Sequence, residues 1–172
     1  MRTLRLVLPL LTLPLAALTA ACAATTATPA AEVRELLDRR QITDLVDRLG
    51  RALDEGRFDD LRTIYTPDAT AKTPGGTAEG RAALIAQASR NHGADLRIQH
   101  VIGNVLIDLR GDAADVRANL IATFASASTD GTIPQPRYTL GEVYRFDAVR
   151  TTEGWRLSRV ETTPIWSTGT RP

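Results

Sequence analysis

The sequence has few of the residues that carry metal, redox or nucleophilic chemistry. Its 172 residues include one cysteine, Cys22, and two histidines, His92 and His100. One cysteine cannot form an intramolecular disulfide, and this set lacks the Cys and His spacing of a zinc site. No phosphate-binding glycine loop and no serine in a G-x-S-x-G turn are present either. We therefore expect no metal and no cofactor.

Positive charge is not in excess. Twenty arginines and one lysine stand against 20 acidic residues, for a formal net charge of +1. Without the first 23 residues, which hold Arg2 and Arg5 and no acidic residue, 19 basic residues remain against 20 acidic ones. This balance provides no basic field for nucleic acid, so we expect no nucleic-acid partner.

Residues 1–23 are typical of an export signal. A short basic start precedes an apolar stretch from Leu6 to Leu18, and small residues follow up to Ala23. The place of Cys22 resembles a bacterial lipoprotein signal, in which that cysteine is acylated. Ordinary cleavage after Ala23, which gives a secreted protein, and an uncleaved anchor over residues 4–24 are the alternatives. We expect export, a tether over residues 24–31, and membrane contact only through the N-terminus.

Hydrophobic periodicity divides the rest of the chain into a helical half and a strand half. A long helix begins at Glu32, and a short helix, a short strand over 69–73 and a helix over 81–91 follow it. Four long period-two segments then cover 98–109, 115–127, 138–149 and 155–166, with glycine-containing turns between them. Helices followed by antiparallel strands predict one α+β domain over 32–167, with a tail at 168–172. The expected buried stripe of the long helix is Leu37, Ile42, Leu45, Val46, Leu49 and Leu53.

Three blocks resemble the SnoaL-like branch of the nuclear-transport-factor-2-like (NTF2-like) superfamily. They are Ala52-Leu53-Asp54-x-Gly56-x-Phe58-Asp59-x-Leu61, then Gln99-His100-x-Ile102-Gly103-Asn104, and then Gly141-x-x-Tyr144 through Gly154-Trp155-Arg156-Leu157 to Trp166. The resemblance implies a cone, in which a curved antiparallel sheet of about four long strands wraps round the N-terminal helices and leaves an apolar pocket. It also implies homodimers through the outer sheet face. Members include dehydratases, isomerases and cyclases, and others bind ligands without chemistry.

Among these enzymes the sequence is most similar to scytalone dehydratase. His100 stands at the place of one of its catalytic histidines, and Asp54 at the place of the aspartate that orients a histidine. Leu53 and Thr73 replace its tyrosines, and Ser126 or a neighbour replaces its second catalytic histidine. The resemblance therefore does not transfer that activity as a whole.

His100 is the candidate catalyst, because histidine has the ordinary pKa nearest neutrality. It alternates with Ile102, Asn104 and Leu106 on one strand face, and such a mixture of polar and aliphatic side chains predicts a pocket wall rather than a sealed core. Asp54 would orient the ring while it exchanges a proton with a bound carbonyl or hydroxyl. Two plainer readings stay open: a neutral His100 hydrogen-bonded without chemistry, and an Asp54 that binds local backbone or an arginine.

Four more residues are candidates for ligand binding: Asn104, Tyr144, Arg159 and Trp166. The first three would hold a ligand by hydrogen bonds, or else satisfy strand edges and one another. Trp166 would line the pocket, or else pack at the core or rim. His92 precedes Gly93 in a polar break, which predicts a solvated helix end.

Two functions fit this pattern. The first is an exported domain whose apolar pocket binds a small hydrophobic molecule. The alternative is a cofactor-independent lyase or isomerase that uses His100 and Asp54 for proton transfer.

Overall fold

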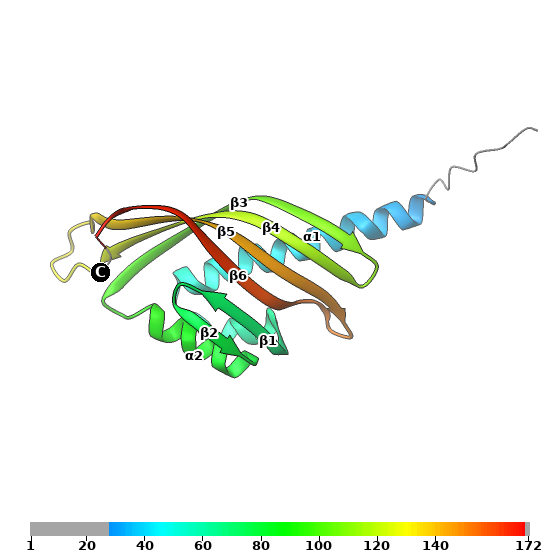
Figure 1. Ribbon diagram of the computed structural model, residues 1–172, viewed down its shortest axis with the longest axis horizontal. Helices are drawn as coiled ribbons and strands as arrows, with labels where there is room; N and C mark the ends of the chain where they lie inside the picture. The colour runs from blue at the N-terminus through cyan, green and yellow to red at the C-terminus, as the bar shows by residue number, and fades with distance from the viewer. Residues whose placement is uncertain (1–27, 171–172) are drawn as a thin grey trace, which may run out of the picture.

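A computed structural model describes residues 28–170 as a curved sheet folded over two helices (Figure 1). The expected export signal, the lipidation site Cys22 and residues 24–27 of the expected tether lie outside the described residues. Within 28–170, no helix has the length and apolar composition needed to cross a membrane. In chain order the elements are α1 (Pro29–Asp54), the 3-10 helix η1 (Phe58–Thr63), β1 (Tyr65–Thr73), β2 (Gly76–Glu79), α2 (Arg81–Asn91), β3 (Leu96–Arg110), β4 (Ala113–Ser126), β5 (Pro136–Thr151) and β6 (Gly154–Gly169).

Helix α1 packs along the inner face of the sheet. Pro29 suits the first helical turn, where its missing N–H has no partner to lose, so residues 29–31 of the expected tether are helical. The predicted stripe is buried except for Leu37, which is 57% exposed because the first turns of α1 extend beyond the sheet (Figure 1). Asp38 takes the buried position there instead. The stripe that packs on the sheet is Ile42, Leu45, Val46, Leu49 and Leu53.

The sheet has six strands in the order β2-β1-β6-β5-β4-β3. The four predicted long strands are confirmed as β3 to β6, each antiparallel to the next. The six-stranded sheet as a whole is mixed, because the shorter strand β1 runs parallel to β6, with Thr70 beside Arg159. Local periodicity carries no sign of this pairing, since the two strands are far apart in the sequence.

A β-bulge in β3 changes which side chains face inward. The register with β4 pairs Gly103 with Asn119 and Leu106 with Arg117, so two residues of β3 stand opposite one residue of β4. Asn104 lies in the bulge with a φ of 52°. Beyond it Leu106 is 61% exposed, whereas Val105 and Ile107 pack against the core. The prediction that Asn104 and Leu106 share the inward face of His100 and Ile102 is therefore wrong.

The backbone conformation of the bulge leads to a prediction about the stability of Asn104 variants. Asn104→Val should lower the free energy of unfolding by about 1–2 kcal/mol, because a β-branched side chain is strained in the left-handed region that Asn104 occupies. Asn104→Gly should be tolerated. Urea unfolding measures both, and Gln99→Val, at an exposed extended position of the same strand, is the control. Equal stability of the two valine variants would contradict the assigned backbone conformation.

Candidate functional site

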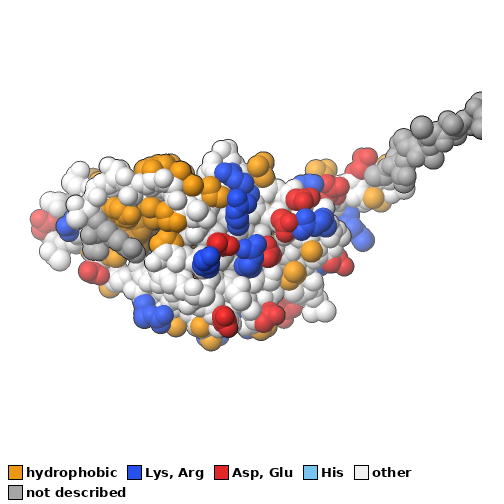
Figure 2. All heavy atoms as spheres, in the orientation of Figure 1, with side chains coloured by type: hydrophobic (Ala, Val, Ile, Leu, Met, Phe, Trp, Pro, Cys, Tyr) orange, Lys and Arg blue, Asp and Glu red, His pale blue; other side chains and the backbone are white. Residues whose placement is uncertain are grey.

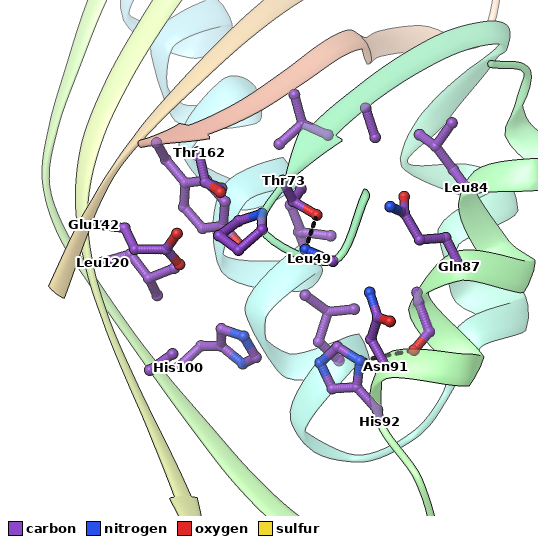
Figure 3. Close-up of a pocket in the computed structure, with 18 of the residues that line it drawn as sticks. Leu49, Thr73, Leu84, Gln87, Asn91, His92, His100, Leu120, Glu142 and Thr162 are labelled. Carbon is purple, nitrogen blue, oxygen red and sulfur yellow. Dashed lines mark hydrogen bonds between the residues drawn. The ribbon is translucent and has the colours of Figure 1, made fainter. Parts of the chain in front are cut away.

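A mostly apolar cavity of about 150 Å³ lies between the inner face of the sheet, α1 and α2 (Figure 3). Strands of the sheet supply one wall with His100, Leu120, Glu142 and Thr162, and α2 supplies the facing wall with Leu84, Gln87, Asn91 and His92. Among the described residues that line the cavity, none is lysine or arginine. The remaining apolar lining includes Leu49, Leu53, Leu61, Tyr65, Ala71, Phe124, Leu140, Tyr144 and Val160.

Asp54 and His100 form the hydrogen-bonded pair that the sequence predicted. The Nδ1 atom of His100 lies 2.6 Å from Oδ1 of Asp54, and the backbone N–H of His100 donates to the same carboxylate at 3.0 Å. These contacts follow from the fold, because β3 is an edge strand and its outward N–H groups have no strand partner. The last residue of α1 covers that edge. The side chain of His100 is 7% exposed and that of Asp54 is 26% exposed.

The contact with Asp54 determines which nitrogen of the neutral His100 ring carries the proton. A carboxylate only accepts hydrogen bonds, so Nδ1 of His100 carries the proton of the neutral ring. Its Nε2 atom is then left with a lone pair, and the ring lines the cavity. In chemical terms this is a base whose orientation and tautomer are set by Asp54.

His92 stands beside this pair, which corrects its interpretation as a solvated helix end. The residue caps the C-terminus of α2, and its ring centroid lies 5.7 Å from that of His100. Its Nδ1 donates to the carbonyl of Ala88 at 2.7 Å, because a carbonyl can only accept. Burial lowers the pKa of His92 below its usual value, although the Ala88 carbonyl opposes that shift. His92 is therefore neutral near pH 7, with Nε2 unprotonated.

Two tyrosines and a carboxyl group are also part of the polar lining. Tyr65 and Tyr144 are each 5% exposed, and burial raises the pKa of both phenols above the usual value. Their hydroxyl groups therefore stay protonated and can donate hydrogen bonds. Glu142 is 8% exposed and turns its carboxyl group toward the cavity from β5 (Figure 3).

Of the four predicted ligand-binding residues, only Tyr144 lines the cavity. Arg159 lies on the outer face, where it donates to Asp147 at 2.6 Å and 2.8 Å and to Glu161 at 3.1 Å. The register explains this placement: Leu157 pairs with Ala148 and Arg159 with Asp147, so Ser158 is an extra residue that turns Arg159 outward. Figure 2 shows basic and acidic side chains beside one another on this face.

Trp166 and Asn104 are turned away from the cavity in the same manner. Pro164 pairs with Glu142 and Trp166 with Gly141, so Ile165 is the extra residue. The indole lies over Gly141, where an added Cβ would come within 2.3 Å of it, and Trp166 is 48% exposed. Asn104 lies in the β3 bulge and is exposed. Contrary to expectation, Asn104, Arg159 and Trp166 do not line this cavity, because each follows or occupies a bulge.

No group of three or more His, Cys, Asp or Glu side chains within residues 28–170 is arranged to hold a metal ion. The cavity instead combines one oriented base with protonated phenols and aliphatic walls. This combination can bind a small molecule and move a proton on it.

Residues 34–161 match the model of the SnoaL-like domain. The chain belongs to the SnoaL-like family. The resemblance that the three sequence blocks carry is thus confirmed, and the α+β fold with a curved, open sheet is the one shared by NTF2-like proteins.

Relatives of this SnoaL-like domain include an uncharacterized protein of Mycobacterium tuberculosis, 35% identical over 133 residues that cover 76% of this chain and 88% of the relative. Among solved structures, a candidate scytalone dehydratase of Novosphingobium aromaticivorans is 20% identical, with a TM-score of 0.67, and the match covers 80% of this chain and 91% of that one. A type 2 hexachlorocyclohexane dehydrochlorinase, LinA, is 17% identical with a TM-score of 0.70, and coverage is 81% and 93%. At these identities the two structures establish the fold alone.

Sequence reasoning did not assign to the SnoaL-like cavity six polar residues that line it: Tyr65, Gln87, Asn91, His92, Glu142 and Thr162. A signal for Gln87 was available. It follows Leu84 by three residues and precedes Asn91 by four, so amides share the inner helix face with leucine. Glu142 likewise alternates with Leu140 and Tyr144 along β5.

Proposed function

We propose that this SnoaL-like domain is a cofactor-independent lyase or isomerase that acts on a small, mostly apolar molecule bound in the cavity. His100 is the general base, and Asp54 orients it. The observation that carries the proposal is the 2.6 Å contact between the two side chains, at the wall of a cavity that is otherwise mostly apolar.

The chemistry needs no further component. Nε2 of His100 forms a bond to a proton as a C–H bond of the substrate breaks, and the electron pair of that bond forms a carbon–carbon double bond. In an elimination, the leaving group on the adjacent carbon departs with its own electron pair. In an isomerisation, the π electron pair of the adjacent carbonyl moves onto its oxygen to give an enolate. That pair then re-forms the carbonyl while the conjugated double bond takes the proton from Nε2 at another carbon of the same molecule. Asp54 stabilises the imidazolium that exists between the two steps.

The phenol groups of Tyr65 and Tyr144 are the proposed hydrogen-bond donors to the substrate. Negative charge that develops on a substrate oxygen or a leaving group needs a hydrogen-bond donor. Tyr65 and Tyr144 can provide one, since burial raises their pKa values and keeps the hydroxyl protons in place. The names of two structural neighbours, a dehydratase and a dehydrochlorinase, also describe eliminations and support this reaction class.

Three probes test the proposal in D₂O: cyclohexanone for proton exchange, 3-cyclohexenone for isomerisation and hexachlorocyclohexane for elimination. We expect the wild type to accelerate at least one reaction over buffer. His100→Asn should lower that rate by about 10²–10⁴-fold, because the amide can still donate to Asp54 but has no base in place of Nε2. Deuterium incorporation and product formation, followed by NMR, measure these rates.

The control is Arg159→Gln, which changes a charged residue on the outer face and should leave the rate unchanged. Equal rates in the wild type and His100→Asn would exclude His100 as the base. Binding of the probes without any reaction would favour the plainer function, a carrier of a small hydrophobic ligand.

A further inference from the structure

Gln87 is a buried residue of α2 whose side chain lines the cavity. Gln87 is 6% exposed, and no hydrogen bond joins its side chain to any other described residue. Thr73, which also lines the cavity at the end of β1, is already engaged, because its hydroxyl accepts from the N–H of Gly75 at 3.1 Å. Buried amides in folded proteins are nearly always hydrogen-bonded.

Neighbouring residues limit the space around the amide of Gln87. The residue extends from α2 toward the cavity, and the sheet wall with His100 and Glu142 faces it (Figure 3). An added Cβ at Gly76, which has a φ of 121°, would lie 3.2 Å from Nε2 of Gln87. A larger residue at the start of β2 would therefore crowd the amide. On the sheet side the hydroxyl of Thr162, a residue only 9% exposed, has no hydrogen-bond partner in the described structure either.

The cavity also limits the size and charge of its occupant. A cavity of about 150 Å³ has room for roughly one six-membered ring. Neither lysine nor arginine is among the described lining residues, whereas Glu142 and Asp54 bring acidic groups to or near it. An anionic ligand would lose its hydration there and gain no opposite charge.

We propose that Gln87 binds an oxygen substituent of the substrate and thereby turns the opposite side of the ring toward His100. The substrate is then a neutral, single-ring molecule with a hydroxyl or carbonyl group. An amide carries both a donor and an acceptor, so it can pair with either group. This inference rests on the proposed function for the part played by His100, but it concerns binding alone and is tested by binding alone.

Phenol and toluene are the matched probes, because they share a ring and differ by a hydroxyl in place of a methyl group. Both are titrated into the wild type, Gln87→Leu and Gln87→Met, and Kd is taken from chemical shifts of the cavity residues. We expect the ratio of the toluene Kd to the phenol Kd to fall by at least about tenfold in both variants. The side-chain NH₂ signal of Gln87 should move with phenol and not with toluene.

Benzoate tests the charge of the ligand, and we expect no binding to the wild type at concentrations that saturate with phenol. Asn91→Leu, at a more exposed amide on the same helix, should change the ratio less than the Gln87 variants do. The same titrations in His100→Asn should retain the wild-type ratio, so a failure of catalysis does not alter this test. A ratio that is equal within about twofold in the wild type and both Gln87 variants would overturn the proposal, as would benzoate binding tighter than phenol.

Discussion

Asp54→Asn should lower kcat by about 10²–10⁴-fold, with little change in KM, on whichever probe the wild type converts. The carboxylate of Asp54 accepts from both the ring and the backbone N–H of His100. Oδ1 of Asp54 accepts from both donors, and Oδ2 also accepts from the backbone N–H, at 3.2 Å. An asparagine side chain puts an NH₂ group in place of one of these oxygens, where it opposes one of the two N–H groups of His100. When its NH₂ group faces Nδ1, the neutral ring carries its proton on Nε2 and can no longer act as a base.

The tautomer gives a readout that does not depend on turnover. In the wild type, ¹⁵N shifts of His100 should show a protonated Nδ1 and an unprotonated Nε2 at high pH, and Asp54→Asn should shift the population toward the other tautomer. Asp44→Asn, which removes the same charge from the exposed face of α1, is the matched control and should leave kcat unchanged. A kcat within about threefold of wild type for Asp54→Asn would show that the pair is structural.

The pairing of Asp54 with His100 could be predicted because both residues belong to motifs whose order resembles a known family. Helix α2 was also predicted with the same ends, Arg81 and Asn91, from its helical hydrophobic period and the polar break at His92 and Gly93 that follows it. The four long strands agree within a few residues of each boundary. The helix and the strands could be predicted because they depend on residue types close together in the sequence.

The errors among the site residues share one physical cause. Asn104 was assigned to the face of His100 on the assumption of strict alternation along the strand. The same alternation, counted from Leu157 and Pro164, would also turn Arg159 and Trp166 inward. One extra residue in a strand reverses the facing of every residue beyond it. The bulges at Asn104, Ser158 and Ile165 are visible only from the pairing with a neighbouring strand. Such pairing depends on contacts distant in sequence, and period-two patterns do not contain it.

The missed residues have a different cause. Gln87 lies on α2 and His92 follows it directly, and the cavity exists only because that helix packs across from the sheet. The sequence shows which face of α2 is apolar, but it does not show which other element meets that face. His92 is brought within 5.7 Å of the His100 ring by this packing.

Asp38→Ala should lower the free energy of unfolding by about 2–4 kcal/mol. Asp38 is 5% exposed and joins α1 to the β5–β6 hairpin: it accepts from Arg150 at 2.5 Å and from Nε1 of Trp155 at 3.0 Å. The guanidinium of Arg150 also lies 4.7 Å from the centre of the Trp155 ring. Removal of the carboxylate leaves the indole N–H and one side of Arg150 without their acceptor. Urea unfolding at pH 7 measures the loss.

The pH dependence of stability supplies an independent check on Asp38. The hydrogen bond from Arg150 lowers the pKa of this carboxyl below its usual value, although burial opposes the shift, and Trp155 adds to the lowering. A lowered pKa in the folded state means that the stabilisation is fully present above the usual Asp pKa of about 3.9 and is lost as pH falls through the lower, folded value. The difference in stability between the wild type and Asp38→Ala should therefore shrink below about pH 4.

Asp112→Ala is the matched control for this pair. Asp112 contacts the same guanidinium, with Oδ1 at 2.8 Å from Nε of Arg150, but its side chain is 82% exposed. An exposed ion pair contributes little, so this variant should lose no more than about 1 kcal/mol at pH 7. Both carboxylates contact Arg150, so comparing the stability losses of the two variants shows how much the burial of Asp38 contributes. Equal losses for the two variants would mean that Asp38 adds no more than an ordinary surface charge, and that apolar packing of α1 alone holds the hairpin.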